Sequence, residues 1–545
     1  MAGPVRGAVY RFPHTTSPRA TARQDETLYT RVPLVEAFSV RGRMAFMQQP
    51  SRRFLVLGLD GGTFDLLDPL MEAGELPFLR SLVHRGVRAP LRSVYPAKTI
   101  PAWYSFATGK DPGELGIYGF TEPDGGPGRS KVVQTFRPAE AFWDRLSRWG
   151  ATVGIVNFPV SAPYALHGFV VPGMFSEHSP TYPKEVRAEI ESSIGGAYPG
   201  ELPPYRDHER TEWLKTATRD VLTRGRAAAA LAEHHRPDFL FALFRETDRV
   251  EHQHWSELSR PVAEIGADLL GFWRAVDRAC REVDRAFRAG GGPTITLVIS
   301  DHGHGAIHSE LFTNRWLADQ RYLIFREGEG LGRRNFLSRC LLYSQRLGIA
   351  RTITRRLADF VRDGRRAELA ELVKGRTTFE EVANRIDWKR TVAFSYPVPE
   401  GIYLNPYNPD LTPERRAELL KEIRARLEAF PDAHIEVLGP TDLYHAATGR
   451  GPSLLIRVDG MCTEPRMDFS YPQPFIRDRP TYFYGTGTHR MDGILIGAGD
   501  GVTPRSVTTP FSLLDLAPTI LEGMGLPLPS GLAGHSFVRD LGLTA

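Results

Sequence analysis

The feature that most constrains the fold of this chain is a series of short, almost wholly apolar runs that alternate with helical patterns. The runs are RFLVLGL, ATVGIVNFP, DFLFALF and TITLVIS, and the helical segments between them include LPFLRSL and FWRAVDRACREVDRAF. Strands without polar alternation are buried on both faces, as in parallel sheets that are covered by helices. The sequence therefore predicts an α/β fold with a mostly parallel sheet between two layers of helices.

Composition narrows the class of protein. The chain has 545 residues, of which 41% are hydrophobic and 24% charged, so it can form a large globular core. The net charge is only +4 and the two signs are interspersed along the sequence, which gives little support for nucleic-acid binding. The three cysteines have no CxxC spacing, so neither a disulfide framework nor a thiolate zinc site is predicted.

No apolar run reaches the roughly 18 residues that a membrane span needs, and the N-terminus lacks the apolar core of a secretion signal. We therefore expect a cytoplasmic protein without a membrane span.

The pattern divides the chain into three parts. Residues 1–50 are rich in Arg, Pro, Thr and Ser without hydrophobic periodicity, and we interpret them as a flexible leader. Residues 51–312 and 385–545 contain the strand and helix patterns of the core. Residues 313–384 are mainly helical and arginine-rich, which predicts an inserted cap over the active edge or a surface for a partner.

The segment YPAKTIPAWYSFATGKDP places a hydroxyl, Thr99, just before a helical run that contains Pro101. The simpler interpretation is a helix cap, because a threonine oxygen accepts a hydrogen bond from an early backbone N–H. The alternative is a nucleophile at the positive end of the helix, where an anion is attracted. This segment alone leaves both interpretations open.

Carboxylates and imidazoles follow several of the predicted strands, where open α/β sheets bind their ligands. Asp248 and His252 are four residues apart, so they lie on one face of a helix and suit two ligands of one metal, although surface pairs with this spacing are common. The wider set that we single out is Asp60, Asp248, His252, Asp301, His302 and His489, together with Thr99.

A ligand set of oxygen and imidazole donors without thiolates suits two Zn²⁺ ions, with Mn²⁺ as an alternative. Two cations about 4 Å apart lower the pKa of a hydroxyl and neutralise a phosphoryl group during in-line displacement. The hydroxyl of Thr99 is then a candidate nucleophile.

These motifs resemble the alkaline phosphatase superfamily, and most closely its type I phosphodiesterase/nucleotide pyrophosphatase-like branch. The resemblance extends from residue 53 to 540 and includes GLDGGTFDLL, YPAKTIPAWYSFATGKDP, TDRVEHQHW, SDHGHG and GTHRMDGILIGAGD. It implies an alkaline phosphatase-like fold and a phospho-threonine intermediate on Thr99. It also implies two metal sites, with Asp248, His252 and His489 in one and Asp60, Thr99, Asp301 and His302 in the other.

Two positions bear on the substrate. Nucleotide-cleaving relatives have an asparagine roughly twenty residues after the nucleophile, where this chain has Phe120. Lys98 precedes the nucleophile and either contacts a substrate oxygen or is simply solvated. We note both as substrate-contact candidates, and we expect His304 and His308 to be exposed loop histidines.

The leading hypothesis is a metal-dependent phosphoester hydrolase, a phosphodiesterase acting on a small phosphorylated substrate. The alternatives are a phosphomonoesterase or phosphoryl transferase of the same superfamily, or a non-catalytic relative that binds phosphorylated ligands. A nucleic-acid-binding module is a further class, whose mark would be binding that weakens steeply with salt.

Overall fold

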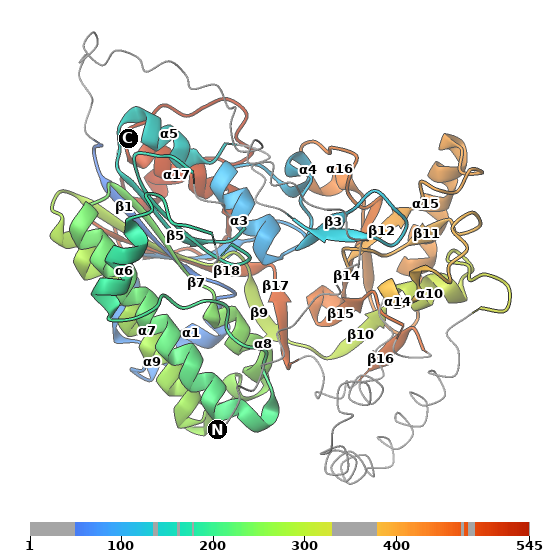
Figure 1. Cartoon of the computed structure of the whole chain (residues 1–545), viewed down its shortest axis with the longest axis horizontal. Coiled ribbons are helices and arrows are strands. Elements are labelled where there is room, and N and C mark those ends of the chain that lie inside the picture. The colour runs from blue at the N-terminus through green and yellow to red at the C-terminus, as the bar shows by residue number, and fades with distance from the viewer. Residues whose placement is uncertain are drawn as a thin grey trace, which may run out of the picture.

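The computed structural model describes residues 50–133, 140–160, 164–176, 179–329, 379–469, 473–477 and 485–543. The predicted leader, apart from Pro50, and residues 330–378 of the predicted insertion lie outside the described residues. The described part forms two lobes that lie side by side, a larger one built on an extended sheet and a smaller one rich in short strands (Figure 1).

The larger lobe is built on a nine-stranded sheet with the order β19-β2-β18-β8-β1-β7-β5-β6, and β20 also pairs with β2. The strands β8, β1, β7, β5 and β6 are mutually parallel, whereas β18 is antiparallel to both of its neighbours. The strand bounds are β1 Arg53–Leu59, β2 Val87–Arg92, β5 Val153–Phe158, β6 Gly168–Pro172, β7 Phe239–Phe244, β8 Thr294–Ile299, β18 Asp492–Gly499, β19 Arg505–Ser506 and β20 Phe511–Ser512. The prediction of a mostly parallel sheet is confirmed.

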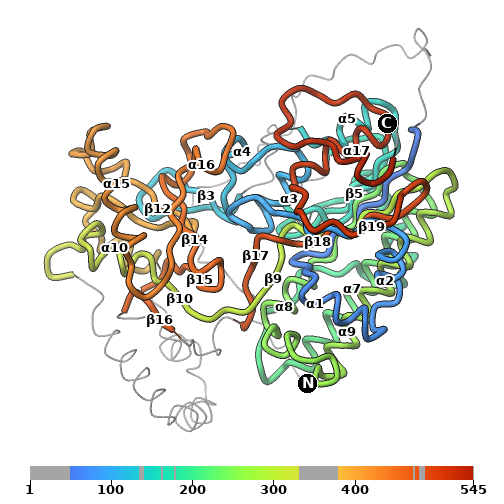
Figure 2. Tube along the Cα trace, turned by 180° about the vertical axis from the view of Figure 1, so that it is seen from behind, coloured from blue at the N-terminus to red at the C-terminus, as the bar shows by residue number. Residues whose placement is uncertain are grey.

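Helices cover both faces of this sheet (Figures 1 and 2). On one face are α1 Phe64–Glu72, α2 Pro77–His84, α7 Arg210–His235 and α9 Ala267–Ala289, and on the other are α3 Thr99–Thr108, α5 Phe142–Trp149 and α17 Leu516–Gly523. Successive residues of β7 alternate between the two cores, Leu240 toward the first and Phe241 toward the second. Because both faces are buried, the strand sequence is apolar throughout, which is why it could be recognised.

The smaller lobe has a core of its own, in which Phe379, Phe394 and Ile456 are buried. Its central sheet has the order β11-β12-β14-β13, and a second sheet has the order β15-β10-β16. The bounds of its strands are β10 Ser309–Phe312, β11 Ala393–Phe394, β12 Gly401–Leu404, β13 Ile435–Leu438, β14 Leu454–Val458, β15 Thr463–Arg466 and β16 Phe475–Arg477. Its helices are α10 Thr313–Asp319, α14 Phe379–Ala383, α15 Pro413–Glu428 and α16 Pro440–Leu443.

Strands β12 and β14, with the sequences GIYL and LLIRV, therefore pair in the antiparallel sheet of the smaller lobe and do not join the nine-stranded sheet. The division of the chain at residues 312 and 385 stays a prediction.

The remaining elements connect the lobes or lie at their junction. They are α4 Pro112–Leu115, β3 Thr121–Pro123, β4 Ser130–Val132, α8 Glu246–Leu258, β9 Gly303–Ala306 and β17 Gly487–Arg490. Helix α6 Val186–Ile194 belongs to the larger lobe, where it packs against α7. Among the helices of the described residues, none is both long and apolar enough to cross a membrane.

Candidate active site

Three carboxylates meet at one edge of the larger sheet because three neighbouring parallel strands end there. Asp60 directly follows β1, Asp301 follows β8, and Asp248 lies in the first turn of α8 after β7. The pairing register aligns these ends, since β1 pairs with β7 on one side and with β8 on the other. The hydroxyl of Thr247 donates to the backbone oxygen of Asp60 at 2.6 Å and so holds the start of α8 against the end of β1.

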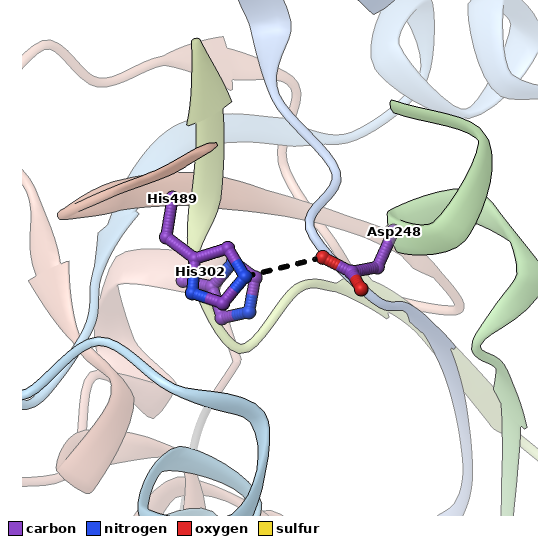
Figure 3. Close-up of side chains that lie close together, drawn as sticks. All are labelled: Asp248, His302 and His489. Carbon is purple, nitrogen blue, oxygen red and sulfur yellow. Dashed lines mark ion pairs between the residues drawn. The ribbon is translucent and has the colours of Figure 1, made fainter. Parts of the chain in front are cut away.

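A two-stranded ribbon brings His489 to the same place. Strand β17 pairs antiparallel with β9, so that His489 lies opposite His304. Strand β9 begins directly after Asp301 and His302 in the sequence, so the pairing brings His489 close to both. The imidazole rings of His489 and His302 stack with centroids 3.7 Å apart. Figure 3 shows both rings turned toward the carboxylate of Asp248, whose Oδ1 lies 3.3 Å from His489 Nε2.

The donor atoms form two clusters that share this centre. In the first, Asp248 Oδ1 lies 3.3 Å from the Nε2 atoms of both His252 and His489, and those two nitrogens are 3.0 Å apart. In the second, His302 Nε2 lies 3.2 Å from Asp301 Oδ2 and 3.7 Å from Asp60 Oδ1. The structure thus brings together all six of the predicted charged or imidazole side chains.

The residues fit the divalent cations that the sequence predicted. Asp248 Oδ1, Asp301 Oδ2 and His302 Nε2 are buried without a hydrogen-bond partner, although they face one another. Buried polar atoms without partners are costly, and a cation bound between them removes that cost. Donor atoms that lie within 4.8 Å of one another, as in the cluster of Asp60, Asp301 and His302, are close enough to hold one ion.

Backbone carbonyls fix the tautomer of each histidine. The Nδ1 atoms of His252, His302 and His489 contact the backbone oxygens of Gly487, Gly303 and Ala97 at 2.8, 3.1 and 2.7 Å. A ring whose Nδ1–H donates to a carbonyl presents Nε2 as an acceptor, the form in which histidine binds metals. All three Nε2 atoms point into the centre.

Thr99 is the first residue of α3 and not its cap. The N-cap position belongs to Lys98, which makes no capping hydrogen bond with its side chain. Thr99 is 2% exposed, and its hydroxyl donates to Asp60 Oδ1 at 3.5 Å. One turn later on the same helix, Trp103 Nε1–H donates to Asp60 Oδ2 at 3.2 Å, so α3 positions both the hydroxyl and the carboxylate beside it.

The electrostatics of the metal-free cluster are unfavourable. Burial raises the pKa of Asp60 well above its usual value, and the negative charges of Asp301 and Asp248 raise it further. Burial also raises the pKa of Asp301 well above its usual value. Burial opposes ionisation of Asp248 as well, but His252 and His489 hold the pKa of that carboxyl well below its usual range. Positive charge at this centre would stabilise all three carboxylates.

The model of the type I phosphodiesterase/nucleotide pyrophosphatase family matches residues 54–415, about two thirds of the chain. The chain belongs to this family. It is therefore an enzyme of the phosphoester hydrolase type, as the sequence predicted.

Two crystal structures have similar folds. Phosphonoacetate hydrolase from Sinorhizobium meliloti, in complex with phosphonoformate, has a TM-score of 0.51 and 14% identity over 86% of this chain and 95% of its own. A variant of the alkaline phosphatase PafA has a TM-score of 0.51 and 13% identity over 90% of this chain and 99% of its own. No curated protein matches the sequence. The fold is thus that of the alkaline phosphatase superfamily.

One prediction about this phosphodiesterase-family chain is wrong. His304 was expected in an exposed loop, but it is 0% exposed, because β9 pairs with β17 and packs against α8. Its Nδ1 lies 3.4 Å from Glu251 Oε2 and 3.7 Å from Asp248 Oδ1. With Asp248 and His252 it forms a further group of donors that could hold a metal ion.

A signal for His304 was present in the sequence. His302 and His304 are two residues apart in an extended segment, a spacing that places both side chains on one face. Glu251 carried no such signal, and both of its carboxylate oxygens are buried without a hydrogen-bond partner. His308 is exposed, as expected.

The two substrate-contact candidates lie in different surroundings. Lys98 forms an ion pair with Glu400 of the smaller lobe, with Nζ and Oε1 2.7 Å apart and 16% of the lysine side chain exposed. Phe120 lines a cavity of about 380 Å³ that also includes Asp60, Thr99, Asp248 and His252. The cavity therefore opens directly onto the nucleophile candidate and onto ligands of both predicted metal sites.

Proposed function

We propose that this protein is a two-metal phosphodiesterase that uses Thr99 as its nucleophile. The observation that carries the proposal is the position of the Thr99 hydroxyl. It is buried at the start of α3, 3.5 Å from Asp60 Oδ1, and it lies on the cavity that is also lined by Asp60, Asp248 and His252.

The ligands divide between two ions. Asp248, His252 and His489 would hold one ion, and Asp60, Thr99, Asp301 and His302 would hold the other. This donor set of oxygens and imidazoles suits Zn²⁺ or Mn²⁺. Bound there, the ions would supply positive charge that lowers the pKa of the Thr99 hydroxyl and neutralises the phosphoryl oxygens.

The residues of the chain then perform a displacement in two steps. The hydrogen bond to Asp60 Oδ1 orients the Thr99 oxygen, which attacks phosphorus as the bond from phosphorus to the leaving alcohol breaks. The first turn of α3 presents its positive end to the oxygens of the transferred group. Water then attacks the phosphorus of the phospho-threonine, which releases phosphate or its monoester and restores the Thr99 hydroxyl.

The substrate is a small phosphorylated compound, and diesters are preferred to monoesters. Phe120 lies where an organic group next to the phosphorus would contact it, because it lines the same cavity as Thr99. Lys98 is already paired with Glu400, so its role toward substrate oxygens stays a prediction. The cytoplasmic location also stays a prediction.

The test compares bis(4-nitrophenyl) phosphate with 4-nitrophenyl phosphate, in the presence of Zn²⁺ or Mn²⁺. The matched variants are Thr99→Ala and Thr108→Ala, because Thr108 lies on the same helix but donates to the Tyr104 oxygen at 2.7 Å, away from the cluster. We expect Thr99→Ala to lower diester turnover by orders of magnitude and Thr108→Ala to change it less than about threefold. A Thr99→Ala protein as active as the wild type would exclude the nucleophile.

A further inference from the structure

One wall of the cavity beside Thr99 is formed by α8, which contributes Arg249 and Gln253 in addition to Asp248 and His252. Arg249 follows Asp248 directly, so its side chain projects from the adjacent face of the helix. The position is partly buried. An arginine thus faces the same space as the hydroxyl and the carboxylate cluster.

The other arginine and the glutamate of this wall have partners within the protein. Arg245 pairs with Glu201 and donates to the Gly200 oxygen at 3.2 Å. Glu246 pairs with Arg224 at 2.8 Å, and the two side chains are 1% and 2% exposed. These ion pairs hold the wall in place, although Glu246 Oε2 is buried without a hydrogen-bond partner.

Arg249 differs from them. Within the described part of the chain it forms no hydrogen bond and no ion pair. A partly buried cation without a partner is unfavourable unless a ligand supplies one. The planar guanidinium binds carboxylate and phosphate oxygens with two parallel hydrogen bonds, so an anion is the natural partner.

The net charge of the carboxylate cluster with its two cations bears on whether Arg249 binds the reacting phosphate or a second anionic group of the substrate. While the Thr99 hydroxyl is still protonated, the three carboxylates of Asp60, Asp248 and Asp301 against two divalent cations would leave one net positive charge, which the single negative charge of a phosphodiester would neutralise. Arg249 adds a positive charge that such a diester leaves without a partner. A second anionic group on the substrate would supply it.

Two aromatic residues of the cavity indicate the chemistry of the substrate atoms between its two anionic groups. Phe120 and Phe175 contact each other with ring centroids 6.0 Å apart, and both line the cavity. Phe175 is 44% exposed and has a φ of 62°, a left-handed conformation that a phenylalanine rarely adopts. Its ring therefore offers apolar surface to the cavity at some conformational cost.

We propose that Arg249 binds a second anionic group, a carboxylate or a phosphate, on the organic part of the substrate. The inference rests on the proposed function, because it places the reacting phosphorus at Thr99. The substrate class is then a phosphodiester whose organic part carries an anion, with the connecting carbon atoms against Phe120 and Phe175. Arg249 is a specificity-determining residue of this site.

The test measures binding, so that it does not depend on turnover. The probes are 3-phosphonopropionate and propylphosphonate, which differ only in a carboxylate in place of a methyl group, titrated calorimetrically into the zinc-loaded protein. We expect the wild type to bind 3-phosphonopropionate at least about tenfold more tightly, since a hydrogen bond to a charged group contributes that much. A third titration with 1,2-ethanediphosphonate shows whether a phosphate-like group or a carboxylate is preferred.

Three variants identify the group responsible. Arg249→Met should remove the preference while leaving the affinity for propylphosphonate within about twofold, and Arg249→Lys should retain part of it, because lysine keeps the charge but not the paired hydrogen bonds. Arg260→Met is the control, since Arg260 is exposed just beyond the end of α8.

The outcomes separate this inference from the proposed function. Equal loss of affinity for both phosphonates in Arg249→Met would place the arginine on the reacting group and overturn the inference. The absence of any preference in the wild type, or of binding by either probe, would overturn it as well. A protein that shows the preference but hydrolyses no diester would instead refute the proposed function and leave the anion site established.

Discussion

Replacing Asp301 by asparagine should stabilise the metal-free protein and destabilise the zinc-loaded one. Asp301 and Asp60 belong to a group whose donor atoms lie within 4.8 Å of one another. Two unit charges at that separation repel by about 3.5 kcal/mol at an effective dielectric constant of about 20. Because the metal-free protein can also relieve this repulsion by taking up a proton, we expect a gain of roughly 1–3 kcal/mol for Asp301→Asn.

The pH dependence gives the sign of the effect. Burial raises the folded-state pKa of Asp60 and Asp301 well above the usual value of 3.8. A carboxyl group whose pKa is raised by folding stabilises the folded protein below its unfolded-state pKa. This contribution to the free energy of unfolding is lost as the pH rises through the folded-state pKa. The advantage of Asp301→Asn in the metal-free protein should therefore grow as the pH is raised and should shrink as the pH is lowered toward 4.

The assay is the thermal unfolding midpoint of wild type and Asp301→Asn at pH 8, with EDTA and with Zn²⁺. We expect the variant to have the higher midpoint in EDTA and the lower one in Zn²⁺, because ligand loss removes the stabilisation that metal binding provides. The control is Asp284→Asn, which breaks a pairing with Arg288 at 3.0 Å and should lower the midpoint in both conditions. An Asp301→Asn midpoint below that of the wild type in EDTA would refute the electrostatic argument.

Three further substitutions test the supports of the site. Trp103→Phe removes the hydrogen bond to Asp60 Oδ2, so we expect diester turnover to fall about tenfold, and an unchanged rate would show that this bond does not position the carboxylate. Gly58→Ala places a Cβ 2.8 Å from Leu243 Cδ1 and 2.9 Å from Trp103 Cη2, and this overlap should lower the free energy of unfolding by about 1–3 kcal/mol. An unchanged free energy of unfolding in urea denaturation would show that the site has room for the extra methyl group. Glu400→Gln removes the ion pair with Lys98, which then keeps only the attraction of Glu464, so the variant should have a lower melting temperature; an unchanged melting temperature would argue against the ion pair.

The sequence predicted the larger sheet and the carboxylates at its edge because one physical rule connects them. Strands such as RFLVLGL are apolar on both faces, and parallel strands of this kind end at the same edge, so Asp60 and Asp301 had to lie close together. Position 489 could not be placed in that way. Its histidine reaches the centre through pairing between β17 and β9, which joins segments that no local pattern relates. The sequence singled out His489 as a candidate, and the resemblance to a family assigned it to a metal site.

Other features were missed because their signals are not periodic. The helical spacing of Asp248 and His252 identified one face of α8, but the neighbouring faces hold Arg249 on the cavity and Glu251 against His304. The amino-acid order alone does not say which face of a helix is lined by a cavity. The sequence also did not distinguish the antiparallel sheet of the smaller lobe from the larger sheet, because short apolar strands have similar sequences in both.

The central claim is that two divalent cations bind next to the Thr99 hydroxyl. The most direct measurement is anomalous diffraction at the zinc absorption edge from crystals of the zinc-loaded protein. We expect two peaks about 4 Å apart, one among Asp248, His252 and His489 and the other among Asp60, Asp301, His302 and the Thr99 oxygen. A single peak, or two peaks of which neither contacts Thr99, would contradict it.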